Sequence, residues 1–334
     1  VNANGPEISF LQIQKIHQSG ITGKGYSIAI IDDGLDTTHP YFSGADILGV
    51  NINVDGSATI GREAARKIGS HGQGAAGVIV GQTSSATSNV VVYGDPVFGG
   101  WAPGARLIFI SFDQYGNQRL GEERAFDWVT NNYQKYNIVA VSLAMYTYMS
   151  RNYLPPCGGR YFPIEWEKSI DNLLNTPVAL VNAEGNMMSV DGNYPGCLDK
   201  AISVAAYQDP VTYEPVSWTS LSPRYNSIVA PCCYVSASQN GSAQNGWENY
   251  GGTSSATPVI ASIFALANQA RPGITREEVI AAMRETARPF GENGYIFPFL
   301  DIPKFFARLS DKSPINTNVR LHGALNYSPT QSPT

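Results

Sequence analysis

Short apolar runs alternate along this chain with longer segments in which apolar residues recur at helical spacing. Residues 26–31, 138–143 and 178–181 are largely apolar and rich in β-branched side chains. This pattern is typical of strands that are buried on both faces of a parallel sheet. Helices are expected over residues 8–17, 122–133, 163–174, 275–286 and 300–309, the fourth with a Thr-x-x-Glu capping box at its start. The alternation predicts an α/β fold.

The segment from Gly251 to Pro258 reads Gly-Gly-Thr-Ser-Ser-Ala-Thr-Pro and leads into an almost entirely apolar stretch. The glycines allow a tight turn, Thr253 and Ser254 can cap a helix, and Pro258 is expected in the first turn, where a missing N–H costs little. Ser254 would then sit near the positive end of a helix dipole, where a developing oxyanion is stabilised. Alone, the pattern fits a structural cap as well as a nucleophile.

Two further polar residues stand at the ends of predicted elements. Asp32 ends the first apolar run, at the sheet edge where catalytic groups collect, although such a position is also common in turns. His71 opens a segment of small residues that would let a helix pack closely against its neighbours. The other histidines, His17, His39 and His322, are assigned to an amphipathic stretch, a turn and a polar tail. His71 is therefore the candidate base.

The chain order of Asp32, His71 and Ser254 resembles that of the subtilisin-like serine proteases. The resemblance covers approximately residues 8–309 and implies a three-layer α/β fold with a mostly parallel central sheet flanked by helices. We expect a peptidase domain over residues 1–309 and a polar tail or linker, rich in Ser, Pro, Asn and Thr, over residues 310–334. Further motifs in the family's order are Gly100-Trp101-Ala102-Pro103-Gly104-Ala105, the strand 138–143, Glu184-Gly185-Asn186, Tyr194-Pro195 and Ala230-Pro231.

The resemblance implies a role for each residue in peptide-bond hydrolysis through an acyl-enzyme. Ser254 would attack the scissile carbonyl, because a neighbouring base makes its hydroxyl a useful nucleophile. His71 would be that base and later the acid that protonates the leaving amine, while Asp32 orients its ring. Asn186 would donate its side-chain amide to the oxyanion. The alternative is that Asn186 is an ordinary turn residue, since Asn after Gly is frequent in turns.

The same resemblance implies that an extended polypeptide binds as an added strand. Ser142, Leu143 and Ala144 would line one edge of the substrate, Tyr115 and Gly116 the other, and Ala183, Glu184 and Gly185 would form part of the pocket for the side chain before the cut. The aromatic-rich stretch 145–163 either forms a rim over this cleft or packs as ordinary surface.

Several positions depart from the family pattern. Glu184 stands where a small residue is usual, so either the pocket prefers a basic or polar side chain or Glu184 turns away from it. Ala144 replaces a glycine, and Asp33 stands where Ser or Thr is common, although the kexin-like branch also has Asp-Asp-Gly. Tyr41 occupies a position that is acidic in many relatives. Calcium needs several oxygen ligands, so a calcium cofactor is doubtful here, and no other cofactor is expected.

The composition agrees with a secreted hydrolase. The formal net charge of −5 provides no basic field for nucleic acid, and no apolar run is long enough to span a bilayer. The chain starts at Val1, which suggests a mature or trimmed form of a zymogen. The resemblance further implies a propeptide that assists folding, and we expect a monomer.

Cysteine spacing leaves the disulfide pattern open. The chain has four cysteines, which allow three complete pairings. Cys157 and Cys197 flank the oxyanion segment and are candidates for one bridge, and in an extracellular protein the adjacent Cys232 and Cys233 would not both stay free. Free buried thiols are the alternative. No Cys/His spacing indicates zinc.

Two other function classes are compatible with parts of the sequence. A catalytically silent peptide-binding module would keep the fold, but the joint presence of Asp32, His71, Asn186 and Ser254 argues against it. A sedolisin-like acid peptidase has a similar Gly-Thr-Ser segment, but it would use a Glu as base and an Asp in place of Asn186.

Overall fold

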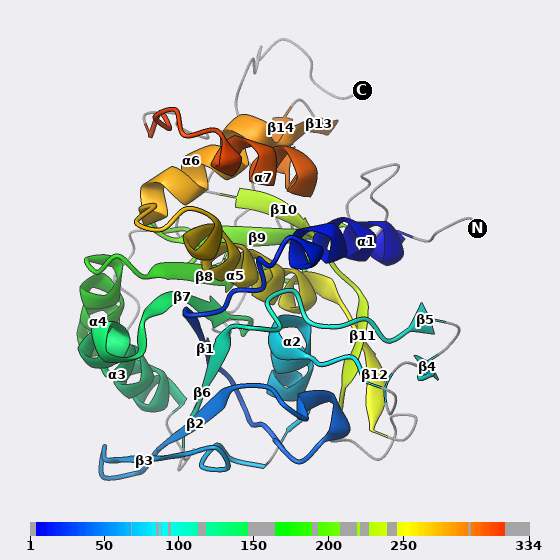
Figure 1. Ribbon diagram of the computed structural model, residues 1–334. Helices are drawn as coiled ribbons and strands as arrows, with labels where there is room; N and C mark the ends of the chain where they lie inside the picture. Colours follow the sequence, from blue (N-terminus) through cyan, green and yellow to red (C-terminus); the bar gives the residue numbers. More distant parts are fainter. Residues whose placement is uncertain are drawn as a thin grey trace, which may run out of the picture.

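A large sheet runs through the centre of the molecule (Figure 1). The computed structural model describes residues 5–67, 69–84, 87, 89–92, 95–112, 118–145, 164–188, 193–207, 219–220, 227–238, 246–292 and 295–317. In sheet order the described strands are β13 (Arg288–Glu292), β14 (Tyr295–Phe299), β10 (Ser227–Pro231), β9 (Ile202–Tyr207), β8 (Ala179–Ala183), β7 (Ile138–Leu143), β1 (Ser27–Ile31), β6 (Arg106–Phe112), β2 (Ile47–Ile52) and β3 (Ala58–Gly61). Neighbours from β14 to β2 run parallel, and the edge strands β13 and β3 pair antiparallel.

Helices cover both faces of this sheet. On one face α1 (Gly5–Gln18), α2 (His71–Val80), α5 (Gly252–Ala270), α6 (Arg276–Thr286) and α7 (Ile302–Ser310) share a hydrophobic cluster with the strands. On the other face α3 (Gln118–Tyr136) and α4 (Ile164–Leu174) share a second cluster. Alternate β1 residues enter the two clusters, Ile28 and Ile30 the first, Ala29 and Ile31 the second. The predicted three-layer fold with a mostly parallel sheet is confirmed.

Three small elements lie outside the large sheet. A 3₁₀ helix spans Pro40–Phe42. Two short antiparallel pairs are formed by β4 (Val91–Val92) with β5 (Asp95–Pro96), and by β11 (Tyr234–Ala237) with β12 (Trp247–Tyr250). The β11–β12 pair packs against α2 (Figure 1). No described helix is both long and apolar enough to cross a membrane.

The start of α5 differs from the sequence prediction. The helix begins at Gly252 after the cap residue Gly251, and no side chain caps it, so Pro258 lies inside the helix and not in its first turn. The reason is that the N–H of Thr253 is already satisfied by the side chain of Asn186, 3.1 Å away. The Ser254 carbonyl lies four residues before Pro258, which has no N–H to bond it.

The chain continues to pack on the domain after α7. After α7 the chain packs back on the domain, with Ile315 buried and the carbonyl of Ser313 accepting hydrogen bonds from Arg271 and Arg308. Arg308 also donates to the carbonyl of Pro314 at 2.8 Å. Residues 313–315 thus pack beyond the expected domain limit at residue 309, and the domain boundary itself stays a prediction.

Candidate active site

The end of β1 and the start of α2 bring a carboxylate and an imidazole together. Asp32 continues the β1 ladder through its N–H, which bonds the carbonyl of Ile110, and its side chain is buried, with only 1% of the residue exposed. His71 is the first residue of α2, and its Nδ1 lies 3.0 Å from each carboxylate oxygen of Asp32. A carboxylate only accepts, so Nδ1 carries the proton and Nε2 is the acceptor of the neutral ring.

Asp33 fixes the start of α2, a role that the sequence analysis missed. One of its carboxylate oxygens accepts from the N–H of Gly72 at 2.8 Å, and the other is 3.4 Å from the N–H of His71. Ser70, the residue before the helix, makes no side-chain cap. The sequence signal for this role was the pair of adjacent carboxylates, Asp32 and Asp33, at the end of a predicted strand. Two adjacent acidic residues thus position the same histidine, one through its ring and one through its backbone.

Three carboxylates determine the charge state of His71. Burial alone would lower the pKa of His71, but the charge and hydrogen bond of Asp32 and the charges of Asp33 and Glu248 together raise it to about 9. Burial raises the pKa of Asp33, and the charge of Asp32 raises it further. Burial also raises the pKa of Glu248, while His71 opposes that shift. The site therefore favours a protonated imidazole up to alkaline pH.

Ser254 lies in the first turn of α5 and is 8% exposed. Its hydroxyl donates to the carbonyl of Ala144 at 3.1 Å. Among the described side chains, the group that contacts His71 Nε2 is the hydroxyl of Tyr250, at 3.4 Å, and no direct hydrogen bond joins Ser254 to His71. The structure thus brings Asp32 and His71 into contact and leaves Ser254 bonded to Ala144. It also places on His71 Nε2 the hydroxyl of Tyr250, a residue that could not be identified from the sequence.

The side-chain amide of Asn186 has a defined orientation. Its Oδ1 accepts from the N–H of Thr253 at 3.1 Å and from the Thr253 hydroxyl at 3.0 Å. Because a backbone N–H can only donate, the oxygen must face Thr253, which leaves the Nδ2 donors of Asn186 for another partner. Thr253 Oγ1 also accepts from the N–H of Gly185 at 3.1 Å, so this threonine couples the 184–186 turn to the start of α5.

The residues expected along the substrate fall into different environments. Ser142 is buried and paired with both β1 and β8, and Leu143 is paired with β8. Ser142 is therefore enclosed by β1 and β8 in the sheet, and the expectation that it lines an edge of the substrate stays a prediction. Ala144 follows the end of β7 and faces Ser254 through its carbonyl. Tyr115, Gly116 and the stretch 146–163 lie outside the described residues.

Residues 183–185, which are expected to form part of the substrate pocket, include a buried glutamate. Ala183 ends β8, and Gly185 has a φ of +100°, a conformation that favours glycine. Glu184 is 1% exposed, and one of its carboxylate oxygens accepts from the Ser227 hydroxyl on β10 at 2.8 Å. The Glu184 carboxylate is thus directed toward β10, which agrees with the alternative that Glu184 turns away from a substrate pocket.

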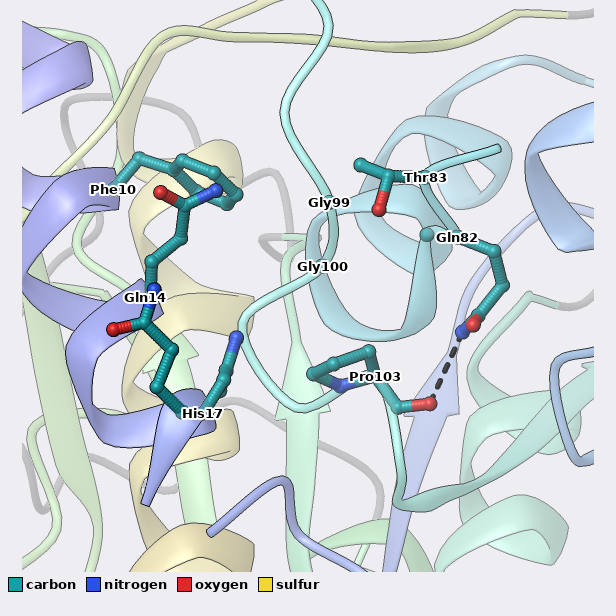
Figure 2. Close-up of a pocket in the computed structure, with 10 residues that line it drawn as sticks. Phe10, Gln14, His17, Gln82, Thr83, Gly99, Gly100 and Pro103 are labelled. Carbon is teal, nitrogen blue, oxygen red and sulfur yellow. Dashed lines mark hydrogen bonds between the residues drawn. The ribbon is translucent and has the colours of Figure 1, made fainter. Parts of the chain in front are cut away.

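A surface cavity of about 430 Å³ lies at the other end of α2, between α1 and the segment around Gly99 and Gly100 (Figure 2). Uncharged polar side chains line it, among them Gln14 and Thr83, and His17 bonds the carbonyl of Trp101 at 2.9 Å. Burial lowers the pKa of His17, although the bond to Trp101 opposes the shift. Because His71 begins α2 and this cavity adjoins the helix end, the cavity is not part of the Asp32–His71 site.

Possible metal ligands and the cysteines are the remaining reactive groups considered among the described residues. In that part of the chain no three His, Cys, Asp or Glu side chains lie together in a way that could hold a metal ion. Cys232 and Cys233 form a disulfide with each other, and the N–H of Cys233 donates to Ser255, the residue after Ser254. Cys197 is also disulfide-bonded, while Cys157 lies outside the described residues.

Known proteins resemble this chain in sequence over most of its length. The model of the subtilase family matches residues 23–317. The thermostable alkaline protease of Halalkalibacterium halodurans is 24% identical over 286 residues, a match that covers 85% of this chain and 68% of that protein. The major intracellular serine protease of Bacillus subtilis is 24% identical over 339 residues, covering 95% of this chain and 94% of that protein.

Among solved structures, fervidolysin from Fervidobacterium pennivorans, a keratinolytic enzyme related to subtilisin, aligns with a TM-score of 0.70. The alignment covers 92% of this chain and 46% of that chain at 20% sequence identity. At this level of identity the likeness concerns the fold alone.

Proposed function

This chain belongs to the subtilase family and is a serine endopeptidase, and we propose that Ser254 is its nucleophile, His71 its general base and Asp32 the residue that orients the base. The observation that carries this proposal is the pair of 3.0 Å contacts from His71 Nδ1 to the buried Asp32 carboxylate. Those contacts leave Nε2 as the proton acceptor.

The reaction proceeds in two halves. The Ser254 oxygen forms a bond to the scissile carbonyl carbon while its proton passes to His71 Nε2, and the carbonyl π electrons move onto oxygen. When the tetrahedral intermediate collapses, the C–N bond breaks and His71 returns the proton to the leaving amine. A water molecule then attacks the acyl-enzyme by the same route, which releases the acid product and restores the Ser254 hydroxyl.

Asn186 and the start of α5 stabilise the oxyanion. The amide oxygen of Asn186 is occupied by Thr253, so its Nδ2 is the end available to a substrate oxygen. The N–H groups of the first α5 turn have no intrahelical partners, and the helix dipole favours negative charge there. These donors act on charge that develops only during the reaction, which is the condition for lowering its barrier.

The substrate is an extended polypeptide that adds backbone hydrogen bonds at the end of β7. Because Ser142 is enclosed in the sheet, these bonds begin at Leu143 and Ala144. Ala183 and Gly185 line the pocket before the cut, together with the backbone of Glu184. The carboxylate of Glu184, bonded to Ser227, supports a pocket without a charge preference from this residue.

The remaining properties follow the family resemblance. We propose that the peptidase domain includes residues up to at least Ile315, that the chain acts as a monomer, and that a propeptide assists its folding as a zymogen. A secreted location suits the Cys232–Cys233 disulfide, because disulfides persist in oxidising compartments. One relative is named an intracellular protease, so the location of this chain has to be measured directly.

A serine-directed fluorophosphonate tests the proposed nucleophile. We expect stoichiometric labelling of the intact chain on Ser254 and none of Ser254→Ala. Ser255→Ala is the matched control. The Ser255 hydroxyl accepts a hydrogen bond from the N–H of Cys233 and so has a structural role, and the Ser255→Ala variant should still be labelled on Ser254. Equal labelling of the intact chain and Ser254→Ala would refute the assignment, and a silent peptide-binding module would label in neither. A sedolisin-like peptidase would be active at acid pH and insensitive to His71→Ala.

A further inference from the structure

Tyr250 presents a phenol hydroxyl to the proposed base, His71. It is the last residue of β12, and its hydroxyl oxygen lies 3.4 Å from His71 Nε2. The two rings meet edge to face, with centroids 5.4 Å apart and an interplanar angle of 70°. The phenol therefore occupies the ring nitrogen that Ser254 needs as its proton acceptor.

The direction of the Tyr250–His71 hydrogen bond follows from the proton on Nδ1. Above the pKa of His71, where the ring is neutral and Nδ1 donates to Asp32, Nε2 accepts and the phenol is the donor. Burial and the charges of Asp32, Asp33 and Glu248 raise the pKa of Tyr250 well above its usual value, although Ser254 opposes the shift. The phenol thus keeps the proton it donates.

Ser254 points its own proton elsewhere in this arrangement. Its hydroxyl donates to the carbonyl of Ala144 at 3.1 Å, whereas the acceptor atom that it needs for reaction, His71 Nε2, faces Tyr250. A nucleophile must reach its base before it can lose a proton. The observed geometry is therefore a resting arrangement of the pair.

The fold holds the Tyr250 ring in a fitted site on α2. Tyr250 is only 6% exposed, and a Cβ atom at Gly74 would lie 2.4 Å from its Cδ2 atom. Gly74 follows His71 by about one helical turn. Because Gly74 has no side chain, the Tyr250 ring can lie beside His71. Any larger residue at position 74 would force the ring to move.

We propose that Tyr250 is a positioning residue that holds His71 and Ser254 in this resting arrangement, and that substrate binding draws its hydroxyl away from Nε2 so that Ser254 can transfer its proton. The inference rests on the proposed roles of His71 and Ser254. The titratable groups that face His71 are Asp32 and Asp33 at the end of β1 and Glu248 and Tyr250 on β12.

Tyr250→Phe tests the inference because it keeps the ring and removes the hydroxyl. We expect the free enzyme to react with the fluorophosphonate about 2- to 10-fold faster at its high-pH plateau, the equivalent of one net hydrogen bond. We also expect the inflection of the pH profile to fall by up to about one unit, since the phenol oxygen accepts from Nε2 of the protonated ring in a charge-assisted bond that is stronger than the bond it donates to the neutral ring.

Two further variants keep the test specific. Gly74→Ala displaces the ring without changing its chemistry and should shift the rate and the inflection in the same directions. Tyr234→Phe is the matched control, because this buried tyrosine lies opposite Tyr250 in the β11–β12 pair and contacts Trp101, and it should change neither quantity.

The outcomes separate this inference from the proposed function. A slower or unchanged plateau rate, or an unmoved inflection, in Tyr250→Phe overturns the positioning role while labelling on Ser254 still holds. Absence of labelling on Ser254 in the unmodified chain overturns the proposed function itself.

Discussion

His71 controls the proton balance of the proposed reaction, and its carboxylate neighbours set the pH at which it works. Asp32, Asp33 and Glu248 outweigh the effect of burial and raise the pKa of His71 to about 9. A protonated ring cannot accept the Ser254 proton, so activity should be low below this pKa and rise above it. We expect kcat/KM for an uncharged peptide substrate to reach half its plateau near pH 9.

A charge-neutralising variant checks the cause of this inflection. Glu248→Gln removes one of the charges that favour protonated His71 and should move the inflection of kcat/KM to lower pH. Glu277→Gln, on the first turn of α6, is the control and should leave it unmoved. An inflection near the ordinary histidine value of about 6.5 in the unmodified chain would contradict the electrostatic account.

Asn186 should act on the rate of the chemical step more than on substrate binding. Asn186→Ala is expected to lower kcat by about 10²–10³-fold with little change in KM, a range that comes from a subtilisin and is borrowed here. Asn268→Ala, which removes an amide bonded within α5, is the control for folding. A loss confined to KM would mean that Asn186 binds substrate and does not stabilise the oxyanion.

Some of these residues could be predicted from the sequence because they stand at the boundaries of recognisable elements. Asp32 ends an apolar run, and His71 and Ser254 begin segments of small residues, so local pattern marks these positions, and their shared chain order assigned the roles. Tyr250 and Glu248 carry no such mark. They reach His71 through the packing of the β11–β12 pair on α2, a contact between segments far apart in the chain that periodicity does not report.

At the scale of the element, α2 approaches the end of β1 so closely that one position requires glycine. A Cβ at Gly72 would lie 2.5 Å from Phe109 Cζ and 2.8 Å from the carbonyl oxygen of Gly34. Gly72→Ala should therefore lower the free energy of unfolding by about 1–3 kcal/mol, measured by urea denaturation. Gly61→Ala, where a Cβ meets nothing within 4 Å, is the matched control. Equal stability of the two variants would contradict this packing.

Element ends show where sequence reasoning fails. The capping box at Thr275 was predictable because both of its partners lie within one turn, Thr275 and Glu278. The start of α5 was not, because the group that satisfies Thr253 comes from Asn186 in another segment. For the same reason the pairing of Ser142 on both sides was invisible in β7 alone. Local signals define elements, and distant partners determine their ends and edges.

At the scale of the whole molecule, the C-terminal limit of the packed unit can be tested by truncation. A chain that ends after Thr317 keeps the buried Ile315 and the bonds from Arg271 and Arg308, and it should unfold at the temperature of the full chain. A chain that ends after Leu309 loses them. Burial of one isoleucine side chain alone is worth about 1.5–3 kcal/mol, so its unfolding midpoint should fall by several degrees. Equal midpoints would support the boundary at residue 309.

In the proposed reaction Ser254 and His71 act as one catalytic unit. The most direct measurement is kcat for Ser254→Ala, His71→Ala and the double variant, on one peptide substrate. Because a base without its nucleophile has no proton to remove, the account predicts that the double variant is no slower than either single variant. Losses that multiply in the double variant would show that the two residues act independently, and they would contradict the account.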